Sequence, residues 1–164
     1  MLTLILGGAR SGKSRHAETL VAAHPAPWLY VATAAAGDAE MAARIAAHQA
    51  RRGEGWRTRE VPLDLPAALA EPHPALVDCL TLWLANLMAA ERDIPAATAA
   101  LETALRARTA PTVLVSNEVG LGIVPDNALA RAFRDEAGRL HQALAVRAER
   151  VLFMVAGLAM VVKG

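Results

Sequence analysis

The chain has 164 residues, of which 54% are hydrophobic and 20% charged, and its formal net charge is +1. This length fits one domain, residues 1–164, with a sizeable core, and the apolar fraction excludes a disordered chain. Because the arginines are scattered among acids, nucleic-acid binding has no support. The single cysteine, Cys79, excludes an internal disulfide and fits a reducing compartment. With no visible signal sequence and no bilayer-length apolar run, we expect a cytoplasmic protein without stable membrane insertion.

Strand and helix patterns alternate along the chain. In chain order, the expected elements are a strand at 2–6, a helix at 14–21, a strand at 28–32, a helix at 38–51, an exposed strand at 57–61, a short helix at 65–70, a strand at 75–79, helices at 80–90 and 95–109, a strand at 112–116, a helix at 127–148, a strand at 151–155 and an edge strand at 159–163. Apolar strands separated by helices predict an α/β domain whose mainly parallel sheet is covered on both faces.

The first strand leads directly into the pattern G-x-x-x-x-G-K-[ST], which Gly7, Gly12, Lys13 and Ser14 satisfy. The glycines let the backbone approach an anion, and the following helix directs its positive end at the same place. On an exposed loop, Lys13 would place its charge on the outer phosphates, and Ser14 would offer a hydroxyl to Mg²⁺. An ordinary Gly/Ser turn is the alternative. The flanking strand and helix favour a phosphate-binding loop, so we expect a nucleoside triphosphate to bind here.

Three polar segments, 7–14, 33–38 and 117–126, follow expected strands and should converge at the carboxyl edge of the sheet, where ligands bind. Asp78 ends another apolar strand and is placed to hold Mg²⁺, with an N-terminal cap for the helix at 80–90 as the alternative. Glu118 is a competing acid, which could equally position a substrate hydroxyl. Cys79 is interpreted as a buried core thiol, and the histidines show no zinc-ligand spacing.

The helix expected at 38–51 carries Arg44, His48, and Arg51 or Arg52 at spacings of four and three to four, which put them on one face. Neighbouring guanidinium groups disfavour the imidazolium form of His48, so a neutral, nucleophilic nitrogen is available at pH 7. The same arginines could hold phosphate oxygens. A solvated basic helix face is the competing interpretation.

Several segments, taken in order, resemble one known family. They are Gly7-Gly8-Ala9-Arg10-Ser11-Gly12-Lys13-Ser14, Tyr30-Val31-Ala32-Thr33, Asp38-Ala39-Glu40-Met41-Ala42-Ala43-Arg44-Ile45-Ala46-Ala47-His48, Trp56-Arg57-Thr58-Arg59-Glu60, Val77-Asp78-Cys79-Leu80-Thr81 and Ser116-Asn117-Glu118-Val119-Gly120-Leu121-Gly122-Ile123-Val124-Pro125. The whole chain resembles the bifunctional adenosylcobinamide kinase / adenosylcobinamide-phosphate guanylyltransferase family of cobalamin (vitamin B12) biosynthesis. This resemblance implies a RecA-like P-loop NTPase fold of three α/β/α layers and a homotrimer.

The resemblance also implies two reactions and their residues. A kinase step transfers the γ-phosphoryl of ATP or GTP to a hydroxyl of adenosylcobinamide, and a guanylyltransferase step moves GMP from GTP onto that phosphate through guanylylated His48. Lys13 would join His48 in catalysis, and Ser14 and Asp78 would hold Mg²⁺. The implied nucleotide-binding residues are Gly7, Gly8, Ala9, Arg10, Ser11, Gly12, Lys13, Ser14, Ala32, Thr33, Ala34, Gln49, Ala50, Arg51, Arg52, Glu60 and Asp78.

Two departures from the family pattern are visible. Arg52 leads to Gly53 where the family often has proline, and the C-terminal residues 157–164 match the family's ending only loosely. Two other functions compete with this interpretation. One is a P-loop kinase for another small molecule, without nucleotidyl transfer. The other is a nucleotide-dependent switch, for which the chain lacks a guanine-specificity element such as N-K-x-D.

Overall fold

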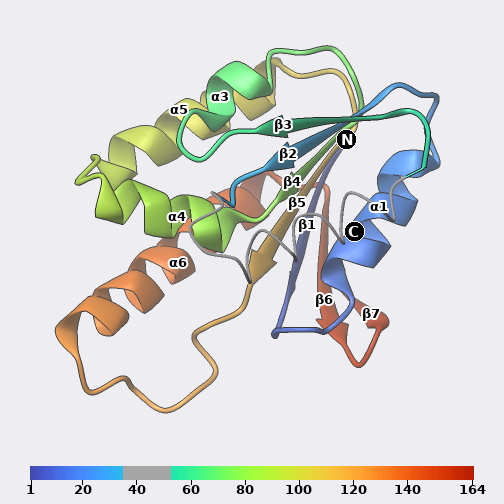
Figure 1. Ribbon diagram of the computed structural model, residues 1–164. Coiled ribbons are helices and arrows are strands. Elements are labelled where there is room, and N and C mark those ends of the chain that lie inside the picture. The colour runs from blue at the N-terminus through green and yellow to red at the C-terminus, as the bar shows by residue number, and fades with distance from the viewer. Residues whose placement is uncertain (35–52) are drawn as a thin grey trace.

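The computed structural model describes residues 1–34 and 53–164, and its described strands form one seven-stranded sheet (Figure 1). The sheet order is β3-β2-β4-β5-β1-β6-β7, and every neighbouring pair is parallel except β6 with β7. The strands are β1 (Leu2–Gly7), β2 (Trp28–Ala32), β3 (Trp56–Glu60), β4 (Ala75–Asp78), β5 (Thr112–Asn117), β6 (Arg150–Val155) and β7 (Leu158–Lys163).

Helices cover both faces of this sheet, as Figure 1 shows. The described helices are α1 (Lys13–Ala22), α3 (Leu65–Ala68), α4 (Leu80–Ala89), α5 (Ile94–Ala107) and α6 (Ala128–Arg147). On one face, Ala17 and Val21 of α1 pack in a cluster with Ile5 and Val115. On the opposite face, a second cluster joins Leu114 to side chains of α3, α4, α5 and α6. The expected three-layer α/β class is therefore confirmed.

The element boundaries differ from the expected ones by a few residues at most. The first helix begins at Lys13 because Gly12, in the left-handed conformation with φ 93°, occupies its N-cap. The strand expected at 75–79 ends at Asp78, since Cys79 is already the N-cap of α4. The helix expected at 38–51 lies outside the described residues.

A half-buried arginine, Arg108, fixes the connection between α3 and β4. Arg108 follows α5, and its guanidinium donates to the backbone carbonyls of Leu69, Glu71 and His73, the Glu71 bond at 2.7 Å and the His73 bond at 2.6 Å. Its Nε also donates to the Thr112 hydroxyl at 2.8 Å. Burial lowers the pKa of Arg108 from its usual value, although Glu71 opposes the shift. The guanidinium of Arg108 thus supplies hydrogen-bond donors to three backbone carbonyls of the α3–β4 loop.

We expect Arg108→Met to lower the free energy of unfolding by about 2–4 kcal/mol, because it leaves part-buried carbonyls without a donor. Urea denaturation measures the change. Arg106→Met is the matched control, because Arg106 lies two residues earlier, in the last turn of α5, and donates to the exposed Thr103 hydroxyl. Equal stability losses in the two variants would contradict this role for Arg108.

Candidate nucleotide-binding site

The backbone between β1 and α1 turns in a way that requires glycine at two positions. Gly7 has φ 153°, and a Cβ there would lie 2.6 Å from the Met154 carbonyl oxygen. Gly12 has φ 93°, and a Cβ there would lie 3.3 Å from the Cα of Gly157. Side chains at these positions would push the loop away from β6 and the β6–β7 turn. The G-x-x-x-x-G spacing is therefore set by close backbone packing on this side of the loop.

The ammonium group of Lys13 folds back onto the loop. Its Nζ donates to the Gly8 carbonyl at 2.5 Å and to the Ser11 hydroxyl at 3.3 Å. Only 6% of Lys13 is exposed, so the expectation of an exposed lysine is wrong. The reason is that Lys13 is the first residue of α1, whose next turn packs against the sheet. Burial lowers the pKa of Lys13, while the nearby Cys79 and Asp78 groups oppose this shift.

Backbone bonds from two other parts of the chain hold the loop in place. The Glu118 N–H donates to the Gly7 carbonyl at 3.0 Å, and the Gly157 N–H donates to the Ser11 carbonyl at 3.0 Å. Gly157 lies in the turn between β6 and β7, with φ 83°. This turn was not among the expected site segments, although Gly157 was a possible signal.

Three of the expected site residues align across neighbouring strands. Ala32 of β2 is paired with Glu60 of β3 on one side and with Asp78 of β4 on the other. Thr33 follows directly and is fully buried. Its Oγ1 donates to the Cys79 carbonyl at 2.7 Å and accepts from the Cys79 N–H at 2.8 Å. The ends of β2 and β4 are therefore locked together at the carboxyl edge.

Asp78 is held as a half-buried carboxylate on the α1 face of the sheet. Its Oδ2 accepts a hydrogen bond from the Tyr30 hydroxyl at 2.9 Å. The N-cap of α4 is Cys79, and that cap has no side-chain hydrogen bond. The helix-cap alternative for Asp78 therefore finds no support. Cys79 is the buried thiol that we expected, and burial raises its pKa.

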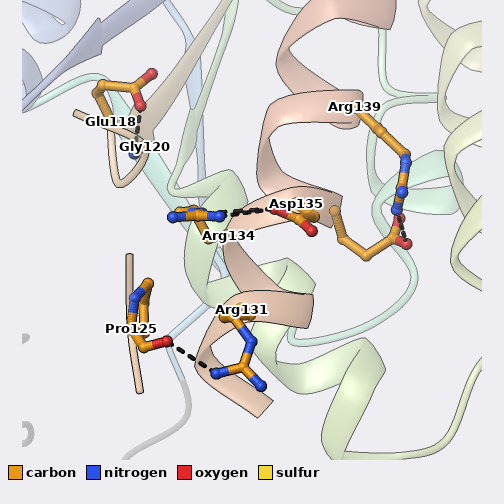
Figure 2. A network of polar contacts seen from close by, with 8 residues as sticks. Glu118, Gly120, Pro125, Arg131, Arg134, Asp135 and Arg139 are labelled. Carbon is orange, nitrogen blue, oxygen red and sulfur yellow. Dashed lines mark hydrogen bonds and ion pairs between the residues drawn. The ribbon is translucent and has the colours of Figure 1, made fainter. Parts of the chain in front are cut away.

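Glu118 begins the loop between β5 and α6. Its Oε1 accepts from the Gly120 N–H at 2.5 Å, as Figure 2 shows. Its Oε2 lies 3.7 Å from Nδ1 of the buried His141 on α6. At the other end of the loop, Arg131 donates to the Pro125 carbonyl at 2.9 Å (Figure 2). The loop between β5 and α6 is thus held by polar contacts at both of its ends.

The described part of the site brings together the loop residues 7–14, Ala32, Thr33, Ala34 and Asp78 at the carboxyl edge, with Glu60 at the exposed end of β3. His48, Gln49, Ala50, Arg51 and Arg52 lie outside the described residues. The contact of His141 with Ser116 and Glu118 was not expected from the sequence. No local spacing could have found it, because His141 and Ser116 are 25 positions apart.

The donor set in the described residues suits one class of metal. Among residues 1–34 and 53–164, no group of three or more His, Cys, Asp and Glu side chains is placed to hold an ion. A carboxylate and a hydroxyl, Asp78 and Ser14, fit Mg²⁺ bound mainly by phosphates and water. In the same part of the chain, no helix combines the length and apolar character needed to span a bilayer.

Comparisons with known proteins agree along the whole chain. A family model described as cobinamide kinase / cobinamide phosphate guanyltransferase matches residues 3–162. The bifunctional adenosylcobalamin biosynthesis protein CobP of Pseudomonas aeruginosa is 53% identical over 170 residues, covering 100% of this chain and 98% of that protein. The corresponding protein CobU of Salmonella typhimurium is 43% identical over 182 residues, covering 99% of this chain and 100% of that protein.

We expect Lys13→Met to weaken triphosphate binding at least about tenfold, because it removes a charge-assisted contact to phosphate. The free energy of unfolding should stay equal or rise, since a desolvated ammonium is replaced by an apolar side chain. Calorimetric titration with GTP and urea denaturation measure the two effects. Arg15→Met, at an exposed position of α1, is the control. Unchanged GTP affinity in Lys13→Met would contradict the role of this lysine.

Proposed function

The chain belongs to the cobinamide kinase / cobinamide phosphate guanyltransferase family, and on that premise we propose how its two reactions proceed. The protein is a bifunctional transferase of cobalamin biosynthesis. In the proposed first reaction, a hydroxyl of adenosylcobinamide attacks the γ-phosphorus of ATP or GTP. In the second, the resulting phosphate receives GMP from GTP, and pyrophosphate leaves. The observation that carries this proposal is a complete phosphate-binding loop in a chain that matches the family from residue 3 to residue 162.

The phosphates of the nucleotide would bind over the N-terminus of α1. There the loop's N–H groups and the helix dipole attract negative charge, and Lys13 can leave the Gly8 carbonyl for a phosphate oxygen. Ser14 and Asp78 would hold Mg²⁺, which neutralises phosphate charge when it is bound. Asp78 is the better-supported acid, because it lies near Lys13 on the face that α1 covers. Ala32, Thr33, Ala34 and Glu60 would complete the nucleotide site at the adjacent strand ends.

His48 is the proposed nucleophile of the second reaction. An imidazole nitrogen attacks the α-phosphorus of GTP, pyrophosphate leaves, and a phosphate oxygen of the acceptor then displaces the histidine. The covalent intermediate divides one difficult transfer of GMP into two easier displacement steps. The support is the run R-I-x-x-H-x-x-x-R together with the family membership. Gln49, Ala50, Arg51 and Arg52 would contact the same nucleotide.

Domain organisation, assembly and location complete the proposal. We infer a single domain over residues 1–164, since the family match spans nearly all of them. We also infer a homotrimer and a cytoplasmic location. Support for self-association comes from β7, an edge strand whose residues are all exposed, including Leu158, Met160, Val161 and Val162. Sedimentation analysis would test the trimer directly.

We expect GTP labelled at the α-phosphate to leave acid-labile, alkali-stable label on the wild-type protein and none on His48→Ala. The kinase reaction should persist in this variant, because γ-phosphoryl transfer needs no covalent histidine. His24→Ala, which should label normally, is the matched control. Full labelling of His48→Ala, or label that withstands acid, would overturn the covalent mechanism.

We expect Asp78→Asn to raise the Mg²⁺ concentration needed for half-maximal turnover in both reactions, because one metal-facing charge is lost. Activity as a function of Mg²⁺ measures the shift, and urea denaturation checks that the fold remains. Asp135→Asn, on the exposed side of α6, serves as the control. If Asp78→Asn leaves the Mg²⁺ dependence unchanged, the metal acid lies elsewhere.

A further inference from the structure

The two acids at the carboxyl edge lie on opposite faces of the sheet. Asp78 accepts from Tyr30, which belongs to the same core cluster as α1. Ser116 and Glu118 of the β5 end instead contact His141 of α6, on the other face. The phosphate-binding loop follows β1, the strand next to β5, and leads into α1 on the face of Asp78. Asp78 therefore lies on the face that α1 covers, with Lys13, and Glu118 lies on the face that α6 covers.

Glu118 is fixed closely relative to the phosphate-binding loop. Its N–H donates to the Gly7 carbonyl at 3.0 Å, so its backbone is part of the support of that loop. Its side chain is 20% exposed, which leaves the carboxylate accessible from solvent. Its Oε1 accepts from the Gly120 N–H (Figure 2). Its Oε2 lies 3.7 Å from Nδ1 of His141. The Glu118 carboxylate is thus hydrogen-bonded at Oε1, and the imidazole of His141 lies beside Oε2.

His141 is held in turn by a buried hydroxyl. Its Nε2 lies 2.7 Å from Oγ of Ser116, which is fully buried, and His141 itself is 7% exposed. Burial lowers the pKa of His141, although Glu118 opposes the shift, and this lowering favours the neutral ring. An ionised carboxylate only accepts hydrogen bonds, which assigns the ring proton to Nδ1 and leaves Nε2 to accept from the Ser116 hydroxyl. The Nδ1–Oε2 distance of 3.7 Å has to shorten in the reacting complex for a hydrogen bond to form.

We propose that Glu118 is the general base of the kinase reaction and that His141, held by Ser116, is its positioning residue. This inference rests on the proposed function. The hydroxyl oxygen of the acceptor forms a bond to the γ-phosphorus, and the bond from that phosphorus to the β-bridging oxygen breaks. The hydroxyl proton passes to a carboxylate oxygen of Glu118, and the nucleoside diphosphate leaves. Glu118 later returns the proton to water.

The two reactions differ in their need for this base. In the kinase reaction the attacking oxygen belongs to an alcohol, which carries its proton at neutral pH. In the guanylyl transfer the attacking oxygen belongs to a phosphate monoester, whose second pKa is about 6, so it is largely ionised at pH 7. A general base should therefore serve the kinase reaction alone. A metal ligand or a purely structural acid would serve both.

Glu118→Gln tests the base, with cobinamide and cobinamide phosphate as separate acceptors for the whole protein. We expect kcat of cobinamide phosphorylation to fall about 100-fold or more, and guanylyl transfer to cobinamide phosphate to stay within about threefold of wild type. Glu136→Gln is the matched control, because Glu136 is a carboxylate of α6 that pairs with Arg139 and not with His141. Kinase turnover within about threefold of wild type, or parallel losses in both reactions, would overturn the proposal. A wild-type protein inactive toward both acceptors would refute the proposed function itself.

His141→Asn and His141→Gln test the positioning. The asparagine amide takes the place of Nδ1 and retains a donor toward Glu118, whereas the glutamine amide takes the place of Nε2 and does not. We expect His141→Gln to lower the kinase kcat about tenfold at unchanged KM, and His141→Asn to keep it within about threefold. Thermal melting verifies that both variants fold. Equal kinase losses in the two variants, or a change in KM alone, would overturn the role of His141, and Glu118→Gln tests the base independently of either.

Discussion

The buried ammonium of Lys13 is the interaction on which the rest of the site depends. A charge with 6% exposure costs free energy unless polar groups replace water, and here the Gly8 carbonyl and the Ser11 hydroxyl do so. These partners exist only because the loop curls over its own lysine. A bound triphosphate would offer the ammonium a fully charged partner. Binding would therefore relieve a desolvation cost that the folded protein already carries, and ligand binding of this kind also stabilises the fold.

The loop can curl in this way because other strands press against it. Met154 of β6 leaves no space for a side chain at Gly7, and the β6–β7 turn leaves little at Gly12, whose φ of 93° also disfavours one. The Glu118 and Gly157 N–H groups then hold the loop from β5 and from that turn. The antiparallel strand β7 therefore extends the sheet and also places a turn against the phosphate-binding loop. The β6–β7 turn supports the site through three-dimensional packing, which a linear sequence motif does not predict.

Local patterns in the sequence predicted much of the fold, because they report local physics. Apolar runs bounded by Pro and Gly located the strands, and the glycine spacing located the phosphate-binding loop. The exposure of Lys13 was predicted wrongly, since it depends on how α1 packs rather than on the loop's composition. The contact of His141 with Ser116 and Glu118 was invisible for a related reason. It joins the end of β5 to the helix that packs on the same face of the sheet, and sequence spacing carries no information about that packing.

The placement of the two acids suggests how one edge of a sheet can serve two transfers. Both reactions need phosphate charge to be neutralised, and Lys13 lies on the α1 face together with Asp78, the proposed Mg²⁺ ligand. Only an alcohol acceptor must lose a proton, and Glu118 lies on the α6 face beside His141, whose neutral form burial favours. A second carboxylate on the α1 face would repel the phosphates that Lys13 attracts. Separation by the sheet lets the base approach the acceptor while the phosphates keep their positive surroundings.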